Sequence, residues 1–250
     1  MKLARLEGRP EIFYTLQGEG KNLGQPSVFV RTSLCNLHCI WCDTDYTWNW
    51  EGTRFEHLYD QRPGYTKYKK SEWIEEISVK DTAELLESYD CKNIVLTGGE
   101  PMLQQDELVA LCRLLKEKDG RYKIEIETNG TLLPGEDFDR SIDQYNVSPK
   151  LSNSNNPEKL RLKPDVLDFF SKSDKAFFKF VIDTETDLAE VQQVISRHSI
   201  RKEHVYLMPQ GVTPAQLHEK RKWLVEICKA HKYNYTDRLH IHIWGSKRGV

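Results

Sequence analysis

Long apolar runs, a large excess of charge and abundant cysteine are all missing from this sequence of 250 residues. It has no stretch of about 18 consecutive apolar residues, so we expect no membrane-spanning helix. The first ten residues lack the apolar segment of a secretory signal. The 36 basic and 38 acidic residues give a net charge of −2, which leaves no electrostatic footprint for nucleic acid or a membrane surface. We therefore expect a cytoplasmic protein that binds neither.

The six cysteines are too few for a disulfide scaffold, and the thiols of a cytosolic protein stay reduced. Three of them stand apart from the rest. Cys112 and Cys228 lie on apolar stripes with helical spacing, and Cys91 precedes an apolar run. We interpret these three as packing residues of the core. The other three cysteines fall close together and need a different explanation.

Apolar, β-branched runs alternate with amphipathic stretches along most of the chain. Strands are predicted at Ser27–Thr32, Asn93–Thr97, Tyr122–Glu127, Tyr145–Ser148, Ala176–Ile182, His204–Met208 and Leu239–Ile243. Helices are predicted at Thr82–Tyr89, Gln105–Lys118, Pro164–Ser171, Asp187–His198 and Pro214–His231. This alternation predicts an α/β fold with a parallel sheet, in the form of a partial (β/α) TIM-like barrel.

A length of 250 residues suits one such domain, 1–250. The polar and aromatic segment from about 48 to 80 interrupts the alternation. We interpret it as an insertion, which is either a lid or a solvated loop. Chemistry gathers at the carboxyl ends of parallel strands, and polar motifs stand there: Thr97-Gly-Gly-Glu-Pro101, Glu127-Thr-Asn-Gly130, Ser148-Pro-Lys150 and Met208-Pro-Gln-Gly211. By contrast, we interpret Asn153-Ser-Asn-Asn156 as a loop that carries little information.

The segment Cys35-Asn-Leu-His-Cys39-Ile-Trp-Cys42 gathers three thiols and a histidine. Soft thiolate ligands select zinc, copper(I) or an iron–sulfur cluster. A closed zinc site would take Cys35, His38, Cys39 and Cys42 from one short stretch, without the second, distant pair of ligands that zinc modules usually have. A [4Fe-4S] cluster normally takes four thiolates, and three would leave one iron open to an external ligand. The cluster is the better interpretation.

With gaps of three and two residues and an aromatic residue before the last cysteine, this segment resembles the radical S-adenosylmethionine superfamily. The resemblance implies that Cys35, Cys39 and Cys42 hold a [4Fe-4S] cluster and that its free iron chelates S-adenosylmethionine. It also implies that Trp41 packs against the adenine. One-electron cleavage of the cofactor would then give a 5′-deoxyadenosyl radical, which abstracts a hydrogen atom from the substrate.

A second element supports this resemblance. Gly98-Gly99-Glu100 follows a predicted strand and is similar to the element that binds the cofactor's amino group in the superfamily. Glycines at the end of a strand also form ordinary turns, and that alternative stays open here. The cofactor contacts implied by the resemblance are Trp41, Asp43, Gly98, Gly99, Glu100, Ser148, Lys150 and Gln210.

Further motifs narrow the family. Arg31 lies four residues before Cys35 in an apolar strand, where a planar guanidinium is placed to bind a carboxylate; a surface charge is the alternative. With Leu16-Gln-Gly-Glu-Gly20, Cys42-Asp-Thr44 and the stretch 244–250, this region resembles the 7-carboxy-7-deazaguanine synthases. The likeness runs from about residue 10 to the end of the sequence, apart from the insertion.

That family implies ring contraction of 6-carboxy-5,6,7,8-tetrahydropterin to 7-carboxy-7-deazaguanine with loss of ammonia, a step toward queuosine. It also implies a magnesium ion held partly by Thr44, whose hydroxyl would otherwise read as a helix cap. The substrate contacts implied are Leu16, Gln17, Gly18, Arg31, Thr97 and, through the chain-terminal carboxylate, Val250.

Such an enzyme needs a one-electron donor, so flavodoxin or ferredoxin is the expected protein partner. The resemblance also implies a homodimer. Two alternatives remain open. A glycyl-radical activating enzyme would share the cysteine segment and the glycine element, and a zinc-binding interaction module would have no catalytic activity.

Overall fold

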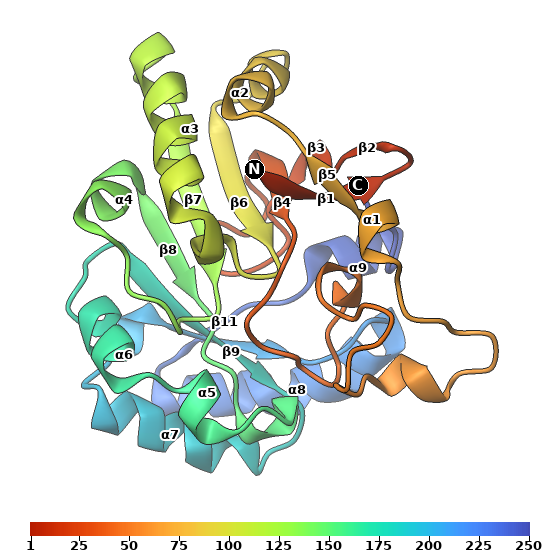
Figure 1. Cartoon of the computed structure of the whole chain (residues 1–250). Coiled ribbons are helices and arrows are strands. Elements are labelled where there is room, and N and C mark those ends of the chain that lie inside the picture. The colour runs from red at the N-terminus through yellow and green to blue at the C-terminus, as the bar shows by residue number, and fades with distance from the viewer.

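The computed structural model describes all residues from 1 to 250, and one mixed sheet of eleven strands runs through it (Figure 1). Its parallel strands are β4 (Pro26–Thr32), β6 (Asn93–Gly98), β7 (Lys123–Thr128), β8 (Gln144–Val147), β9 (Ala176–Ile182), β10 (Val205–Pro209) and β11 (Asn234–Tyr235). Neighbours follow the order β11-β10-β9-β8-β7-β6-β4. The predicted strands from Ser27 to Met208 are therefore confirmed.

Four antiparallel strands complete the sheet: β1 (Lys2–Leu6), β2 (Arg9–Pro10), β3 (Ile12–Leu16) and β5 (Ile74–Glu76). β1 and β3 pair with β4, while β2 and β5 pair with β1. The order ends at β11 on one side and at β2 on the other, so the sheet does not close. The partial barrel predicted from the alternation is confirmed, although the sequence pattern did not predict these four short strands.

Helices cover the outer side of the parallel strands (Figure 1). They are α2 (Val79–Glu87), α3 (Gln105–Lys118), α4 (Glu136–Ser141), α6 (Pro164–Ser171), α7 (Asp187–Arg197) and α8 (Pro214–His231). Three further helices are α1 (Lys70–Trp73), α5 (Glu158–Arg161) and α9 (Leu239–Trp244). α8 begins with a capping box, in which the Thr213 side chain accepts a bond from the Gln216 amide and Pro214 occupies the first turn. No helix is both long and apolar enough to cross a membrane.

The core lies between the parallel strands and these helices. All seven residues of β9 are buried, and α3 presents Leu108, Leu111, Cys112 and Leu115 to the core. Cys91, Cys112 and Cys228 all belong to the main cluster of buried apolar side chains. Their interpretation as packing residues is confirmed. The three clustered cysteines differ from them because they line a cavity.

The predicted strand Leu239–Ile243 is wrong, because this segment forms helix α9. Alternating apolar and histidine residues suggested a half-buried strand, yet only Ile241 is buried. The segment instead turns across the end of the sheet, where the Leu239 amide donates to the Gly18 carbonyl at 2.9 Å. A tertiary contact therefore determines the conformation of this segment, rather than its alternation of apolar and polar residues.

The segment 48–80 is more than a solvated loop. Trp48, Asn49 and His57 are buried, and the segment ends in β5, which pairs with β1. Asp45, just before it, accepts bonds from the hydroxyls of Tyr65 at 2.6 Å and Tyr68 at 3.2 Å. These contacts hold the segment beside the cysteine loop.

Candidate active site

One cavity of about 290 Å³ opens at the carboxyl ends of the parallel strands. The four strand-end motifs, the cysteine loop, the Leu16–Glu19 turn and the residues 246–250 all line it. Every candidate site residue lies on this wall except Glu100: Leu16, Gln17, Gly18, Arg31, Cys35, Cys39, Trp41, Cys42, Asp43, Thr44, Thr97, Gly98, Gly99, Ser148, Lys150, Gln210 and Val250. The chain thus brings together residues from both ends of the sequence.

Neighbouring residues hold the cysteine loop in place and leave each sulfur with one nearby donor. The Leu37 amide lies 3.5 Å from Sγ of Cys35, and the Asn156 side-chain amide lies 3.4 Å from Sγ of Cys39. The Thr44 hydroxyl lies 3.5 Å from Sγ of Cys42. Hydrogen bonds to sulfur tune the potential of an iron–sulfur cluster, so these donors have a chemical as well as a structural effect.

The loop Asn153–Asn156 is an important support, contrary to our interpretation of the sequence. The Asn153 carbonyl accepts a bond from the Trp41 indole at 2.8 Å, and the Asn156 side chain accepts one from the His38 amide at 2.9 Å. Its four residues therefore fix the cysteine loop from the side of β8. Four small polar residues in a row gave no signal of this, because the contact spans more than 110 positions.

Burial raises the pKa of all three clustered cysteines, and that of Cys42 rises to about 12, with Asp43 adding repulsion. Alone, the thiols stay protonated at neutral pH, so a positively charged metal centre is needed to make them thiolates. His38 does not join them: its ring stacks on Phe55 with centroids 3.5 Å apart. No group of three histidine, cysteine or acidic side chains is arranged to hold a single metal ion.

These observations disfavour the closed zinc site and fit an iron–sulfur cluster. Three soft donors line one cavity, and they are not arranged with a histidine, a further cysteine or an acidic side chain around a single ion. The donor set therefore suits a larger centre with one position left open.

Two glycines let the end of β6 pass close to the cysteine loop. A Cβ on Gly98 or Gly99 would collide with the backbone oxygens of Thr32 and Leu34 respectively. The Gly99 amide donates to the Thr32 carbonyl at 3.2 Å, and Gly98 has φ +135°, which only glycine adopts readily. The glycines are thus required by backbone packing next to the cysteines, in addition to any approach of a ligand.

Glu100 is fully buried behind the cavity wall. Its carboxylate accepts bonds from the amides of Met102 at 3.0 Å and Asn129 at 2.7 Å and from the Thr128 hydroxyl at 2.9 Å. Burial raises the pKa of Glu100 although these donors oppose the rise. In this arrangement Glu100 ties the end of β6 to the end of β7, while its contact with a cofactor amino group stays a prediction.

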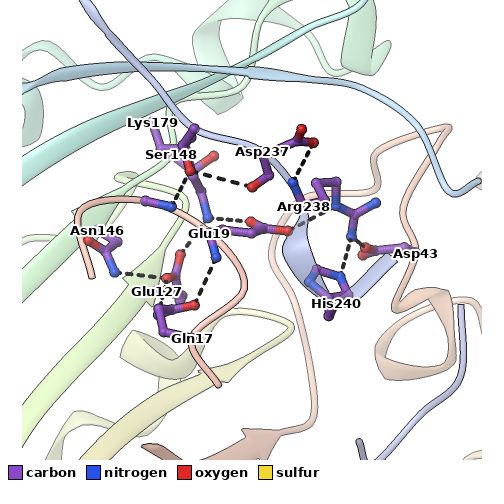
Figure 2. Close-up of polar contacts among 12 residues, drawn as sticks. Gln17, Glu19, Asp43, Glu127, Asn146, Ser148, Lys179, Asp237, Arg238 and His240 are labelled. Atoms are coloured by element: carbon purple, nitrogen blue, oxygen red, sulfur yellow. Dashed lines mark hydrogen bonds and ion pairs between the residues drawn. The ribbon is translucent and has the colours of Figure 1, made fainter. Parts of the chain in front are cut away.

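A chain of buried charges crosses the cavity floor (Figure 2). Lys179 lies between Glu19 and Glu127, at 2.6 and 2.8 Å. Arg238 pairs with Glu19 at 2.9 Å and also with Asp43, next to the last cysteine. Burial opposes the charged form of Glu19, but Lys179 and Arg238 hold its pKa well below the usual range. Lys179 was not among the predicted site residues, although a single lysine inside the apolar run Ala176–Ile182 indicates a buried and paired charge.

Gln17 and Gly18 are positioned by this network. The Gln17 side-chain amide donates to Glu125 and, at 3.3 Å, to Glu127. Gly18 has no room for a Cβ, because that atom would collide with the His240 ring. Glu127 begins one of the strand-end motifs noted in the sequence, whereas Glu125 and His240 belong to no such motif, and only their spatial neighbours reveal their roles.

Charge on the cavity wall favours anions. Six basic and three acidic side chains line it: Arg31, Lys150, Lys179, Arg238, Lys247 and Arg248 against Glu19, Asp43 and Glu127. Lys150 donates to the Ser148 hydroxyl at 2.9 Å, so these two predicted cofactor contacts lie side by side. Gln210 is held at the rim by Lys220, which donates to its carbonyl at 2.7 Å. A carboxylate-bearing ligand suits such a wall.

Comparison with known proteins places the chain in a family. Residues 29–150 match the Radical SAM superfamily. A 7-carboxy-7-deazaguanine synthase from Pyrobaculum aerophilum is 35% identical over 244 residues, covering 96% of this chain and 95% of that protein. Synthases of the same name from Halobacterium salinarum and Rhodopirellula baltica are 34% and 32% identical, covering 94% and 96% of this chain and 89% and 87% of theirs.

Among solved structures, the crystal structure of QueE from Escherichia coli has the same fold. It is 24% identical to this chain, the alignment covers 92% of each chain, and the TM-score is 0.65. With the sequence relatives, this establishes that the chain belongs to the 7-carboxy-7-deazaguanine synthase family of radical S-adenosylmethionine enzymes.

Proposed function

We propose that this protein is a 7-carboxy-7-deazaguanine synthase. It contracts the ring of 6-carboxy-5,6,7,8-tetrahydropterin to 7-carboxy-7-deazaguanine and releases ammonia, in the route toward queuosine. The observation that carries the proposal is one cavity lined both by Cys35, Cys39 and Cys42 and by Gln17 and Arg31. The relatives do not favour a glycyl-radical activating enzyme, because they are named as synthases.

The cofactors are a [4Fe-4S] cluster, S-adenosylmethionine and Mg²⁺. When bound, they supply one-electron radical chemistry. Cys35, Cys39 and Cys42 would hold the cluster, and Thr44, which borders Cys42, would provide an oxygen ligand to magnesium. Trp41, Asp43, the Gly98-Gly99 turn, Ser148 and Lys150 would hold the S-adenosylmethionine, with Lys150 facing its carboxylate.

Other groups that line the same cavity would bind and orient the substrate. The Nε of Arg31 donates to Glu11 at 3.1 Å and the side chain makes no other hydrogen bond within the protein. Its Nη atoms therefore stay available for the substrate carboxylate. Leu16, Gln17, Gly18, Thr97 and Val250 would complete the pocket around the ring.

Partners and context belong to the proposal as well. A flavodoxin or ferredoxin would supply the electron, the enzyme would work as a homodimer in the cytoplasm, and the chain would act as one domain. The last point is supported by a single cluster of 36 buried residues that draws on most strands and helices.

The proposal is tested with anaerobically reconstituted, chemically reduced protein. It is incubated with S-adenosylmethionine, Mg²⁺ and 6-carboxy-5,6,7,8-tetrahydropterin, and the product is identified by mass spectrometry together with released ammonia. We expect 7-carboxy-7-deazaguanine with ammonia in equal amount. A preparation that cleaves S-adenosylmethionine but forms no deazapurine would refute the proposed substrate.

A further inference from the structure

The stretch 246–250 crosses the cavity mouth and is held there by one side chain, Arg248. Its Nη2 donates to Oε2 of Glu11 at 2.5 Å and to the Arg5 carbonyl at 3.1 Å. Gly249 follows with φ +72°, and a Cβ there would come within 2.7 Å of Leu6. The chain therefore lies tightly on β1 at this point, with Ser246 to Val250 lining the cavity.

Two aromatic rings contact this arginine, Tyr46 just before the insertion and Trp73 within it. The Arg248 guanidinium lies 3.6 Å from the centre of the Tyr46 ring and 5.1 Å from that of Trp73. Trp73 ends α1 and directly precedes β5, whose register on β1 pairs Ala4 with Ile74. A guanidinium between aromatic faces and a carboxylate gains both cation–π attraction and a charge-assisted bond. The pairing of β5 with β1 thus holds Trp73 next to Arg248 in the 246–250 stretch.

Glu11 links Arg248 to the substrate side. Its carboxylate has no exposed surface and accepts from three groups: Arg31 Nε at 3.1 Å, Tyr46 hydroxyl at 3.3 Å and Arg248 Nη2. Arg248 donates to Oε2 and so competes with the Nη atoms of Arg31 for that oxygen. Two guanidiniums on one carboxylate also leave an excess positive charge beside the cavity, which suits a bound carboxylate.

We propose that Arg248, Glu11 and Trp73 form a latch that positions both the 246–250 stretch and Arg31 around the substrate, and that the insertion contributes to this latch through Trp73. This inference rests on the proposed function for the identity of the substrate. Arg248 and Trp73 are positioning residues: breaking the latch frees residues 246–250 and allows Glu11 to draw in the Nη atoms of Arg31. Substrate binding weakens, while the cluster and the chemical step are retained.

The latch is tested with Trp73→Leu, which leaves the sequence of the 246–250 stretch intact, and with Trp73→Phe as the conservative variant. Arg248→Lys keeps the charge but removes the planar fork, and its side chain is 22% exposed, so the variant should fold. Arg62→Gln is the matched control, because Arg62 stacks at 3.6 Å on Tyr59 in the same insertion without contacting the stretch.

For each reconstituted protein, we would measure the rate of tryptic cleavage after Lys247 and the iron content. Steady-state kinetics with the carboxylated tetrahydropterin would give KM and kcat. For Trp73→Leu we expect cleavage to rise at least about threefold and KM about three- to tenfold, with kcat within about twofold. Arg248→Lys should raise KM to a similar extent. Trp73→Phe and Arg62→Gln should stay near wild type, and iron content should be unchanged in all four.

Wild-type cleavage and KM in both Trp73→Leu and Arg248→Lys would overturn the latch. Faster cleavage with an unchanged KM would overturn its role in substrate binding. If the wild-type protein forms no deazapurine, the proposed function fails, and the cleavage rates still decide whether Trp73 holds the stretch.

Discussion

Replacing Gly99 with alanine should detach the end of β6 from the cysteine loop. The added Cβ would lie well inside van der Waals distance of the Leu34 carbonyl oxygen and 3.1 Å from Cβ of Cys35. Leu34 has little freedom to retreat, because its amide donates to Thr47 at 3.0 Å and its backbone is held at φ 76°. That conformation is already costly for a side chain larger than glycine.

The size of the effect follows from this geometry. Ordinary contact requires Leu34 to move by more than about 1 Å, and overpacking of this kind costs about 1–3 kcal/mol. Because Cys35 is the next residue, the same movement displaces the first cluster ligand. We expect Gly99→Ala to lower the free energy of unfolding by about 2 kcal/mol and to reduce iron and sulfide to well under half of the wild-type content.

The assay is anaerobic reconstitution followed by iron and sulfide analysis, the EPR spectrum of the reduced cluster and urea unfolding. Gly120→Ala is the matched control, since a Cβ at Gly120 meets nothing within 4 Å and its φ is not positive. That variant should keep full iron content and stability. A Gly99→Ala protein with wild-type iron, an unchanged spectrum and stability within about 0.5 kcal/mol of wild type would refute the reasoning.

Further changes test other parts of the site. Burial and repulsion from Glu127 raise the pKa of Glu125 to about 7, from 4.5, so the folded form keeps a proton that the unfolded chain has released. This contribution to stability is present at low pH and is lost as pH rises from about 4.5 to 7. The unfolding free energy of Glu125→Gln should therefore fall less between pH 5 and pH 8 than that of the wild type. A fall as large as in the wild type would contradict this assignment. Lys179→Met leaves the buried Glu127 without a cationic partner and Glu19 with Arg238 alone. It should cost about 3 kcal/mol in urea unfolding, whereas a cost under about 1 kcal/mol would argue against a buried pair. Arg31→Ala should raise KM for the carboxylated pterin with iron content intact; loss of iron would give this arginine a structural role instead. Thr44→Ala should reduce the Mg²⁺ dependence of turnover, and an unaltered metal response would remove Thr44 from the magnesium site.

Patterns that repeat over short distances were reliable predictors of this fold. The run Ala176–Ile182, apolar except for Lys179, predicted a buried strand that the structure contains, because a strand covered on both faces is apolar at nearly every position. Polar strands such as Lys2–Leu6 and the helix at Leu239–Trp244 were missed or misassigned, because their state depends on what they pair with rather than on their own composition.

By itself the sequence determined the cysteine segment, the glycine turn and the strand-end motifs, since each is a contiguous set of residues whose chemistry is legible from its spacing. Only the tertiary structure decided how these sets meet. It placed Lys179 between two carboxylates, set Asn156 beside Cys39, and joined Glu11 to Arg248 across 237 positions of chain. Such contacts form only when folding buries and pairs groups that are distant in the sequence, so no local pattern of residues predicts them.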